Sequence, residues 1–381
     1  MEGDVQVMRR LDTTPQRSRI SGARSVHRVD EGSRPQQRYV SQYTELSRTI
    51  RDSGLLDRRY GYYWSRIVVV TLAFAAVWAG IVMLGNSWFQ LLMAGALGVV
   101  LTQFGFLGHD CSHRQIFRSP VWSEWVARVL SGAFAGLSHS WWKGKHDKHH
   151  ANPNREGADP DIAPGVIAFT RDIADGREHG VRGWFINRQG WLFFPLLTLE
   201  GLNLHVASVR MLIASPRIAH RRIEATMVIS RLVGYVVLVL LLMSPGKAAA
   251  FIGVQLAVFG VLLGGAFAPN HKGMPIVPAT MRIDFLHRQV LMSRNVRGGA
   301  VTDFVMGGLN YQIEHHLFPS MPRPNLKHAR PIVRDYCAQH QVPYTETGLF
   351  HSYAIVVSYL NNVGLQARDP FDCPLASQLR D

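Results

Sequence analysis

Seven histidines occur in three clusters whose spacing is that of metal ligands on helices: His109 and His113; His146, His149 and His150; His315 and His316. Residues three or four positions apart lie on one face of a helix, so each cluster can turn its side chains toward one point. Gln312 opens the third cluster, where the second has a histidine. A single zinc ion needs about four ligands, so seven imidazoles and one amide predict two metal ions. Imidazoles without nearby cysteine pairs favour iron, copper or zinc.

A histidine-rich tract can also be an ordinary polar surface. The first cluster directly follows a long uncharged run, and all three clusters have ligand spacing, which favours a metal site over a surface. Cys111 lies inside the first cluster but on a different helix face, so we expect it to pack rather than to bind metal. The histidines outside the clusters are expected to be core or surface residues: His27, His139, His179, His205, His220, His287, His328, His340 and His351.

Two long apolar runs predict membrane-spanning helices. Residues 67–108 contain no charged side chain, and residues 232–268 contain only Lys247. At a rise of about 1.5 Å per residue, the first run would reach roughly 60 Å as one helix, twice the hydrocarbon core, so it must cross twice. Turn residues interrupt each run near its middle. The predicted spans are 67–84, 88–107, 232–243 extended to about 226, and 248–268.

A shorter apolar segment at 191–199 is interrupted by Pro195. A stretch of about ten residues indicates a buried or interfacial segment rather than a span. One further crossing there would also put the third histidine cluster on the opposite side of the membrane from the first two. We therefore predict four spans, arranged as two helical hairpins.

The distribution of arginine predicts the orientation. Both hairpin turns are nearly uncharged, whereas arginines flank the other ends of the spans, so the positive-inside rule predicts that both termini and residues 109–230 are cytoplasmic. This arrangement also explains the net charge of +14. The basic residues are dispersed around spans and accompany no recognition motif, which argues against a nucleic-acid-binding protein.

The predicted organisation has three parts. Residues 1–60 form a basic arm without an apolar leader segment, which we expect to be disordered and either attracted to anionic lipid or simply solvated. Residues 61–330 form the membrane domain, and residues 331–381 form a cytoplasmic C-terminal segment. The three cysteines provide no disulfide framework, as is typical of a reducing compartment: Cys111, Cys337 and Cys373.

The clusters and their surroundings together resemble the membrane fatty acid desaturase family over roughly residues 60–330. The resemblance rests on the first cluster, on the run 140–150 (SWWKGKHDKHH), on Asn154, Gly157 and the run 159–161 (DPD), and on the run 308–319 (GLNYQIEHHLFP). Glutamine at position 312 is similar to the third box of front-end desaturases of the delta-6 or linoleoyl-CoA type. The resemblance implies an all-α protein with four spans and a cytoplasmic helical cap that carries the boxes.

The resemblance also implies a nonhaem diiron centre that uses O₂ to insert a cis double bond into an acyl chain. The seven clustered histidines would be ligands, and His271 matches a further ligand position of the family. Gln312 departs from the histidine found in many members, so it and Asn270 would bind through water or support a ligand. Such a protein is expected in a membrane, here a bacterial plasma membrane.

Several nearby residues suit supporting roles. Asp110 and Glu314 lie inside clusters, where a carboxylate can orient an imidazole or can simply be solvated. Trp141, Trp142 and Trp191 fit either a membrane-interface belt or the wall of an acyl tunnel.

The resemblance implies two kinds of partner. The substrate would be a fatty acyl-CoA or an acyl-lipid, because both present a long methylene chain. Two electrons per turnover would come from a separate ferredoxin, cytochrome b5 or flavin reductase, since no dinucleotide motif or haem-binding segment is visible. Dispersed basic residues would favour an acidic carrier.

Two alternative functions remain open. A histidine-box hydroxylase or ketolase would share the metal site and differ in its product. A histidine-rich metal transporter is the more distant alternative, because its spans would be expected to contain ionisable residues, and residues 67–108 contain none.

Overall fold

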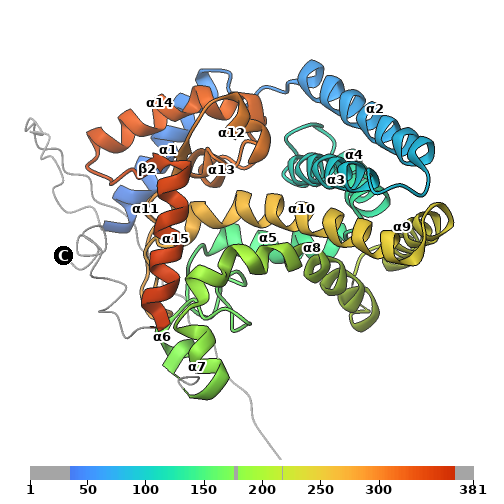
Figure 1. Ribbon diagram of the computed structural model, residues 1–381. Helices are drawn as coiled ribbons and strands as arrows, with labels where there is room; N and C mark the ends of the chain where they lie inside the picture. The colour runs from blue at the N-terminus through green and yellow to red at the C-terminus, as the bar shows by residue number, and fades with distance from the viewer. Residues whose placement is uncertain (1–34, 176–178, 217, 365–381) are drawn as a thin grey trace, which may run out of the picture.

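Helices make up almost all of the regular structure in the computed structural model, which describes residues 35–175, 179–216 and 218–364 (Figure 1). The first half of the chain contains α1 Pro35–Asp52, α2 Tyr60–Leu84, α3 Gln90–Ser112, α4 Pro120–Arg128, the π-helix η1 Val129–Ala135, α5 His139–Ala151, α6 Arg171–Asp175 and α7 Gly180–Ile186. The second half contains α8 Gln189–Ala214, α9 Arg221–Leu242, α10 Pro245–His271, α11 Phe285–Leu291, β1 Asn295–Arg297, α12 Ala300–Val305, α13 Gln312–Leu317, α14 Arg323–Gln339, β2 Glu346–Gly348 and α15 Leu349–Gly364.

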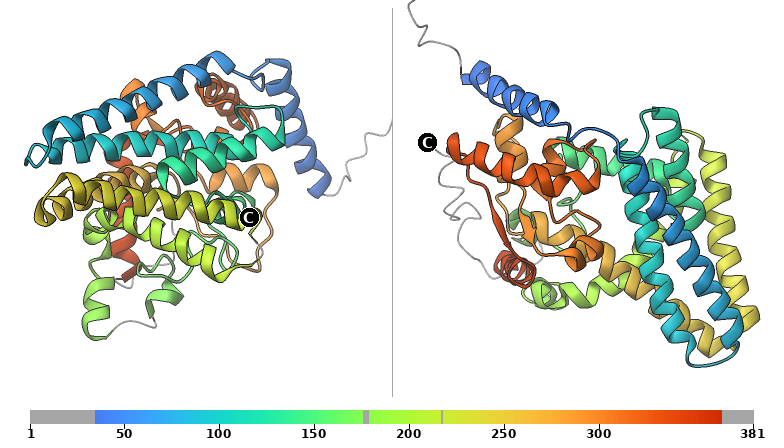
Figure 2. Two further views of the ribbon diagram at one scale, coloured as in Figure 1. Left: turned by 90° about the vertical axis from the view of Figure 1, so that its right-hand side faces the viewer. Right: turned by 90° about the horizontal axis from the view of Figure 1, so that it is seen from above.

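The two expected hairpins are α2 with α3 and α9 with α10. Figure 2 shows α2, α3, α9 and α10 extending together away from the cap helices. The turns of the two hairpins meet at the far end, where Lys247 Nζ and the backbone N–H of Ser244 donate to Asn86 at 2.7 and 3.0 Å. The only charge in the second apolar run therefore lies at a helix end, where it satisfies a backbone carbonyl.

Apolar side chains are exposed along the outer faces of these hairpins. Leu72 is 64% exposed and Leu241 is 76% exposed. Water-soluble proteins rarely expose continuous apolar patches of this kind, whereas a helix surrounded by lipid does. The chain is therefore a multi-pass integral membrane protein, in agreement with the expected all-α membrane fold.

The structure corrects the reading of the segment 191–199. It is not a short isolated segment, because it forms part of α8, a continuous helix of 26 residues with Pro195 inside it. By length and composition α8 is a fifth helix able to cross a membrane, where we expected four. Pro195 is the seventh residue of α8, so the helix loses the one backbone hydrogen bond that an N–H there would donate to Trp191 O, and it continues through this position.

Both ends of α8 are bonded to helices near the histidine clusters. At its start, the Gln189 side chain donates to Leu360 O of α15 at 3.0 Å. Near its end, Ser208 Oγ accepts from the backbone N–H of Ser138, which caps the start of α5, at 3.2 Å. Along its middle α8 lies against α10.

Part of the expected N-terminal arm is ordered. Residues 1–34 lie outside the described residues, but 35–52 form α1, and Leu46 and Ile50 are fully buried among residues of α11, α13 and α14. The Tyr336 hydroxyl of α14 donates to Gln42 O at 2.8 Å. The expected disorder is therefore wrong for this stretch, because two apolar residues one helical turn apart anchor it.

The expected boundary at residue 330 does not separate two units. It falls inside α14, which packs against α13. Beyond α14, β2 pairs in parallel with β1, with Asn295 opposite Glu346, and α15 packs along α8 and α10. This C-terminal stretch belongs to the same helical cap as the clusters.

Candidate metal centre

The clustered histidines come from the ends of two long helices and from two helices of the cap. His109 and His113 lie at the C-terminal end of α3, and His271 is the last residue of α10. The remaining five are His146, His149 and His150 of α5 and the pair His315 and His316 of α13. The two hairpins thus place the C-terminal ends of α3 and α10 next to each other, and the cap helices cover these ends.

The first group of imidazoles joins three elements. The side chains of His109, His113, His146 and His315 each offer a nitrogen, and these nitrogens lie within 4.8 Å of one another. His146 Nε2 is 2.9 Å from His113 Nε2. Four converging nitrogens match the ligand number of a single transition-metal ion.

The second group lies beside the first. His149, His271 and His316 offer nitrogens within the same 4.8 Å limit, and His149 Nε2 is 3.2 Å from His271 Nε2. His271 therefore lies with the clustered histidines, and its role as a metal ligand stays a prediction.

His150 lies between the two groups. Its Nε2 is 3.0 Å from His146 Nε2, and its ring stacks on His316 with centroids 4.2 Å apart. The eight histidines therefore form one continuous cluster with two centres, each large enough for one ion.

Gln312 and Asn270 lie at the second centre. The Gln312 amide is 2.9 Å from His271 Nε2, and Asn270 Nδ2 donates to Gln312 Oε1 at 3.2 Å. The helix of residues 312–317 turns Gln312 toward the same face as His315 and His316, as the spacing predicted. Both amides are fully enclosed by protein.

Three imidazoles are held by a hydrogen bond at Nδ1. His149 Nδ1 lies 3.1 Å from both oxygens of Asp159, His271 Nδ1 lies 2.9 Å from Met292 O, and His316 Nδ1 lies 2.9 Å from Gln289 Oε1. Such bonds fix the ring and direct Nε2 into the centre, which is how metal-binding histidines are commonly oriented. Sequence reasoning named Asp159 only as part of a motif and did not identify Gln289 or Met292.

The two carboxylates inside the clusters differ in role. Asp110 Oδ1 is 3.3 Å from His109 Nδ1, and its other oxygen pairs with Arg323 at 2.7 Å, so this carboxylate does orient an imidazole. Glu314 accepts instead from the Asn295 amide at 2.7 Å and from the Tyr344 hydroxyl at 2.8 Å. It is neither solvated nor bonded to a histidine.

Burial keeps most of the cap imidazoles neutral. The pKa values of His146, His150, His315 and His316 lie well below the ordinary value, first because burial penalises the charged form and then because neighbouring imidazoles repel a proton. The neutral form is the one that binds metal. Buried Nε2 atoms of His109, His315 and His316 have no hydrogen-bond partner within the described chain. Such orphaned buried nitrogens are costly unless they have a ligand, which fits a metal at these positions.

Asp159 and Asp161 form a third group with His149. Burial tends to lower the pKa of His149, but the carboxylates of Asp161 and Asp159 outweigh it, and the pKa is raised. Lys145 pairs with Asp161 at 2.8 Å, and backbone N–H groups donate to Asp159. Because protein donors already satisfy these carboxylates, the group supports the centre rather than forming another.

A cavity of about 660 Å³ reaches the histidines. His109, His146, His149 and His271 lie along its wall. The rest of the lining is mainly apolar, and α3, α8 and α10 supply these members of it: Phe106, Phe193, Leu197, Leu204, Leu263 and Phe267. A methylene chain in this cavity would lie beside the imidazoles and away from water.

The tryptophans divide between the two expected roles. Trp141 and Trp142 line the cavity, and Trp142 stacks on His146 with centroids 4.3 Å apart. Trp191 is 71% exposed on α8, as a residue at a membrane interface would be. Among the described residues none of the other histidines joins the metal-ligand groups, and Cys111 is buried apart from them; His27 and Cys373 lie outside the described residues.

Comparison with known proteins gives a consistent result. Residues 86–348 match the family model for fatty acid desaturase. The chain is 26% identical over 340 residues to a Delta(8)-fatty-acid desaturase of Helianthus annuus, which covers 86% of this chain and 74% of that relative. It is 25% identical over 353 residues to an acyl-lipid (9-3)-desaturase of Borago officinalis, covering 90% and 77%. A Delta(6)-fatty-acid desaturase of Caenorhabditis elegans is 27% identical over 356 residues, covering 89% and 78%.

Proposed function

Because this chain belongs to the fatty acid desaturase family and is a membrane-bound oxidoreductase of lipid metabolism, we propose that its eight clustered histidines hold two iron ions. The observation that carries the proposal is the convergence of these imidazoles from four helices, with four of them, His109, His146, His149 and His271, lining a mainly apolar cavity. Iron and O₂ would supply an oxidant strong enough to remove hydrogens from an unactivated methylene, which no side chain can do.

The two centres would divide the ligands. His109, His113, His146 and His315 would hold one ion, and His149, His271 and His316 would hold the other, with His150 between them. Gln312 and Asn270 would support the second centre through water or through His271.

The protein's contribution is to position the acyl chain and to exclude water. The ring centroid of Phe267 lies 6.3 Å from that of His109 and 6.2 Å from that of His146, so its side chain can hold a methylene group beside these imidazoles. The apolar lining removes water from the reacting carbon and from reactive oxygen species. No general acid or base is needed at the carbon.

The cavity wall also carries charge. Lys145 pairs with Asp161, and Lys272 Nζ donates to Asp161 O at 3.0 Å. We assign this end to the polar carrier of the acyl chain, a CoA thioester or a lipid ester. The proposed product is an acyl chain with a new cis double bond. The relatives named above are a Delta(8)-, a Delta(6)- and an acyl-lipid (9-3)-desaturase, so we place this bond in the half of the chain nearer the carboxyl group.

The proposed topology has four spans, with α8 on the side of the cap. The hydrogen bonds from one end of α8 to α15 and from the other end to the start of α5 support this arrangement. If α8 crossed the membrane, its two ends would lie on opposite sides, and α15 and α5 could not both belong to one cap. Arginines at the cap ends of the spans support a cytoplasmic location for the site and both termini.

The electrons would come from a separate ferredoxin, cytochrome b5 or flavin reductase. We expect purified chain with NADH and O₂ alone to be inactive, and a reductase with its small carrier to restore turnover. Activity without them would contradict the proposal.

Expression in a desaturase-deficient host tests the activity. Mass spectrometry of its fatty acids should show a loss of two hydrogens, whereas a hydroxylase or ketolase would add oxygen. His315→Ala should abolish the product and His351→Ala, which changes an exposed histidine of α15, should not. The purified protein should contain about two irons per chain; stoichiometric zinc with activity that survives iron removal would refute the metal assignment.

A further inference from the structure

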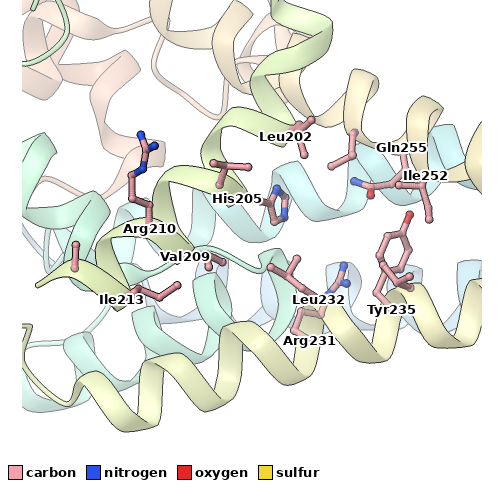
Figure 3. A pocket seen from close by; sticks show the side chains of 14 residues that line it. Leu202, His205, Val209, Arg210, Ile213, Arg231, Leu232, Tyr235, Ile252 and Gln255 are labelled. Atoms are coloured by element: carbon pink, nitrogen blue, oxygen red, sulfur yellow. The ribbon is translucent and has the colours of Figure 1, made fainter.

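A second cavity of about 630 Å³ lies between α8, α9 and α10 (Figure 3). It shares no lining residue with the cavity at the histidines. Most of its lining is aliphatic and includes Leu202, Val206, Val209, Ile213, Leu232, Val236, Ile252 and Leu256.

Arg231 brings a cation into this apolar cavity. Its Nε donates to Phe134 O at 2.9 Å, and its guanidinium lies over the Tyr235 ring at 4.9 Å. No carboxylate of the described residues forms an ion pair with it. A charge facing apolar surroundings without a partner is costly, so it is expected to have an anionic ligand.

Two further polar groups point into the same space. Tyr235 Oη and Gln255 Nε2 are buried and have no hydrogen-bond partner within the described chain. Figure 3 shows Arg231, Tyr235 and Gln255 directed toward one part of the cavity, with Arg210 at its other edge. All four can donate hydrogen bonds, and together they offer more donors than the two oxygens of a carboxylate can use. A phosphate group matches them better.

The cavity opens to the side of the helices. Leu202, Val206 and Ile213 line it and are 50%, 53% and 71% exposed. These residues would face lipid, so a ligand can enter from the bilayer with its apolar part along the aliphatic lining. The ligand must therefore be an amphiphile with an anionic head.

We propose that this cavity binds one anionic phospholipid of the surrounding membrane, with its phosphate at Arg231, Tyr235 and Gln255 and an acyl chain along α8 and α10. The lipid would bridge α8 to α9. Because α8 also supplies Phe193, Leu197 and Leu204 to the cavity at the histidines, the lipid would help to hold that wall in place.

Native mass spectrometry of the detergent-purified full chain tests the proposal. Dioleoylphosphatidylglycerol, dioleoylphosphatidylcholine and oleate are added separately and in competition. We expect one phosphatidylglycerol per chain, bound about tenfold more tightly than phosphatidylcholine, because both lipids present an ionised phosphate but only phosphatidylcholine adds a quaternary ammonium that the Arg231 guanidinium would repel. Arg231→Gln should remove the preference.

Two variants separate the site from general effects. Tyr235→Phe removes a hydroxyl that has no partner among the residues that the structure describes, so it should keep the thermal stability of the lipid-free chain and weaken phosphatidylglycerol binding. Arg222→Gln removes an exposed charge of α9 outside the cavity and should leave binding unchanged. Equal binding of the two phospholipids, equal losses in Arg222→Gln and Arg231→Gln, or displacement of phosphatidylglycerol by equimolar oleate would overturn the proposal. Binding is measured without turnover, so its failure would not affect the proposed activity.

Discussion

At the scale of single residues, the Nδ1 bonds decide which nitrogen each imidazole presents. Asp159, Met292 O and Gln289 hold three rings of the second centre. Each bond comes from a different segment of the chain, so the second centre is built only when these segments have packed. The first centre depends in a similar way on Asp110, which Arg323 holds by an ion pair.

Asp159→Asn tests this support directly. Asparagine keeps the shape of the side chain but loses the charge that holds the Nδ1 proton of His149. We expect iron affinity or desaturation to fall 10- to 100-fold, as is usual when the partner of a ligand is removed. Asp147→Asn is the matched control, because Asp147 is exposed on α5 and pairs with Lys143 of the same helix rather than with an imidazole. Undiminished iron content and activity in Asp159→Asn would show that the bond is dispensable.

Gln312 is the second residue to test. Its amide is 2.9 Å from His271 Nε2, close enough to hold a metal-bound water or the metal itself. We expect Gln312→Ala to lose most desaturation yet retain more iron than His316→Ala, and Gln312→Asn, one methylene shorter, to be nearly as damaging. Iron content and product yield of the three variants are measured together; a fully active Gln312→Ala enzyme would make this residue a bystander.

At the scale of elements, the packing of α8 on α10 depends on glycine. A Cβ at Gly260 would lie 2.4 Å from Leu197 O, whereas a Cβ at Gly253 of the same helix would meet nothing within 4 Å. Small residues let two backbones approach closely in this way.

Substitution by alanine should have opposite effects at Gly260 and Gly253. Gly260→Ala should destabilise the protein by about 1–3 kcal/mol through overpacking, while Gly253→Ala should be neutral or stabilising by up to about 1 kcal/mol. Thermal unfolding in detergent gives the comparison. A Gly260→Ala protein as stable as Gly253→Ala would mean that α8 does not lie this close to α10.

The position of α8 can be tested by labelling. In a variant without native cysteines, single cysteines at Asn187 and Ser215, on either side of α8, should react with an impermeant thiol reagent from the same side of the membrane. A cysteine at Asn86, in the hairpin turn, should react from the other side. Reaction of positions 187 and 215 from opposite sides would establish α8 as a fifth span.

At the scale of the whole molecule, the metal centre joins the two hairpins to the cap. Its histidines belong to α3, α5, α10 and α13, which are far apart in the sequence. A ligand that binds only the folded state stabilises it, by about 4 kcal/mol at a thousandfold excess over its Kd.

Iron removal should therefore lower the melting temperature of the intact chain. Chelation followed by thermal unfolding measures the effect, and re-addition of iron should reverse it. His316→Ala should respond less to chelation than the unaltered chain does. Identical melting temperatures with and without iron would indicate that the cluster is held by protein contacts alone.

The sequence by itself determined what depends on local periodicity. Ligand spacing three and four residues apart predicted which histidines share a helix face, and uncharged runs predicted both hairpins. The resemblance to the desaturase family placed His271 with the clusters. The length of α8 was misjudged, because a short apolar stretch and Pro195 do not reveal how far a helix continues. The order of α1 was missed as well, because its two buried residues, Leu46 and Ile50, are recognised as buried only once the helices that cover them are known.

Tertiary structure alone decided how the imidazoles divide into two centres and what holds them. Gln289, Met292 O and Arg323 reach the histidines through packing between distant segments, and one sequence carries no signal of such contacts. The same holds for the second cavity. Arg231, Tyr235 and Gln255 come from two helices, and only their packing against α8 brings them into one apolar space, where the described part of the chain offers no ion pair to the cation and no partner to the two donors.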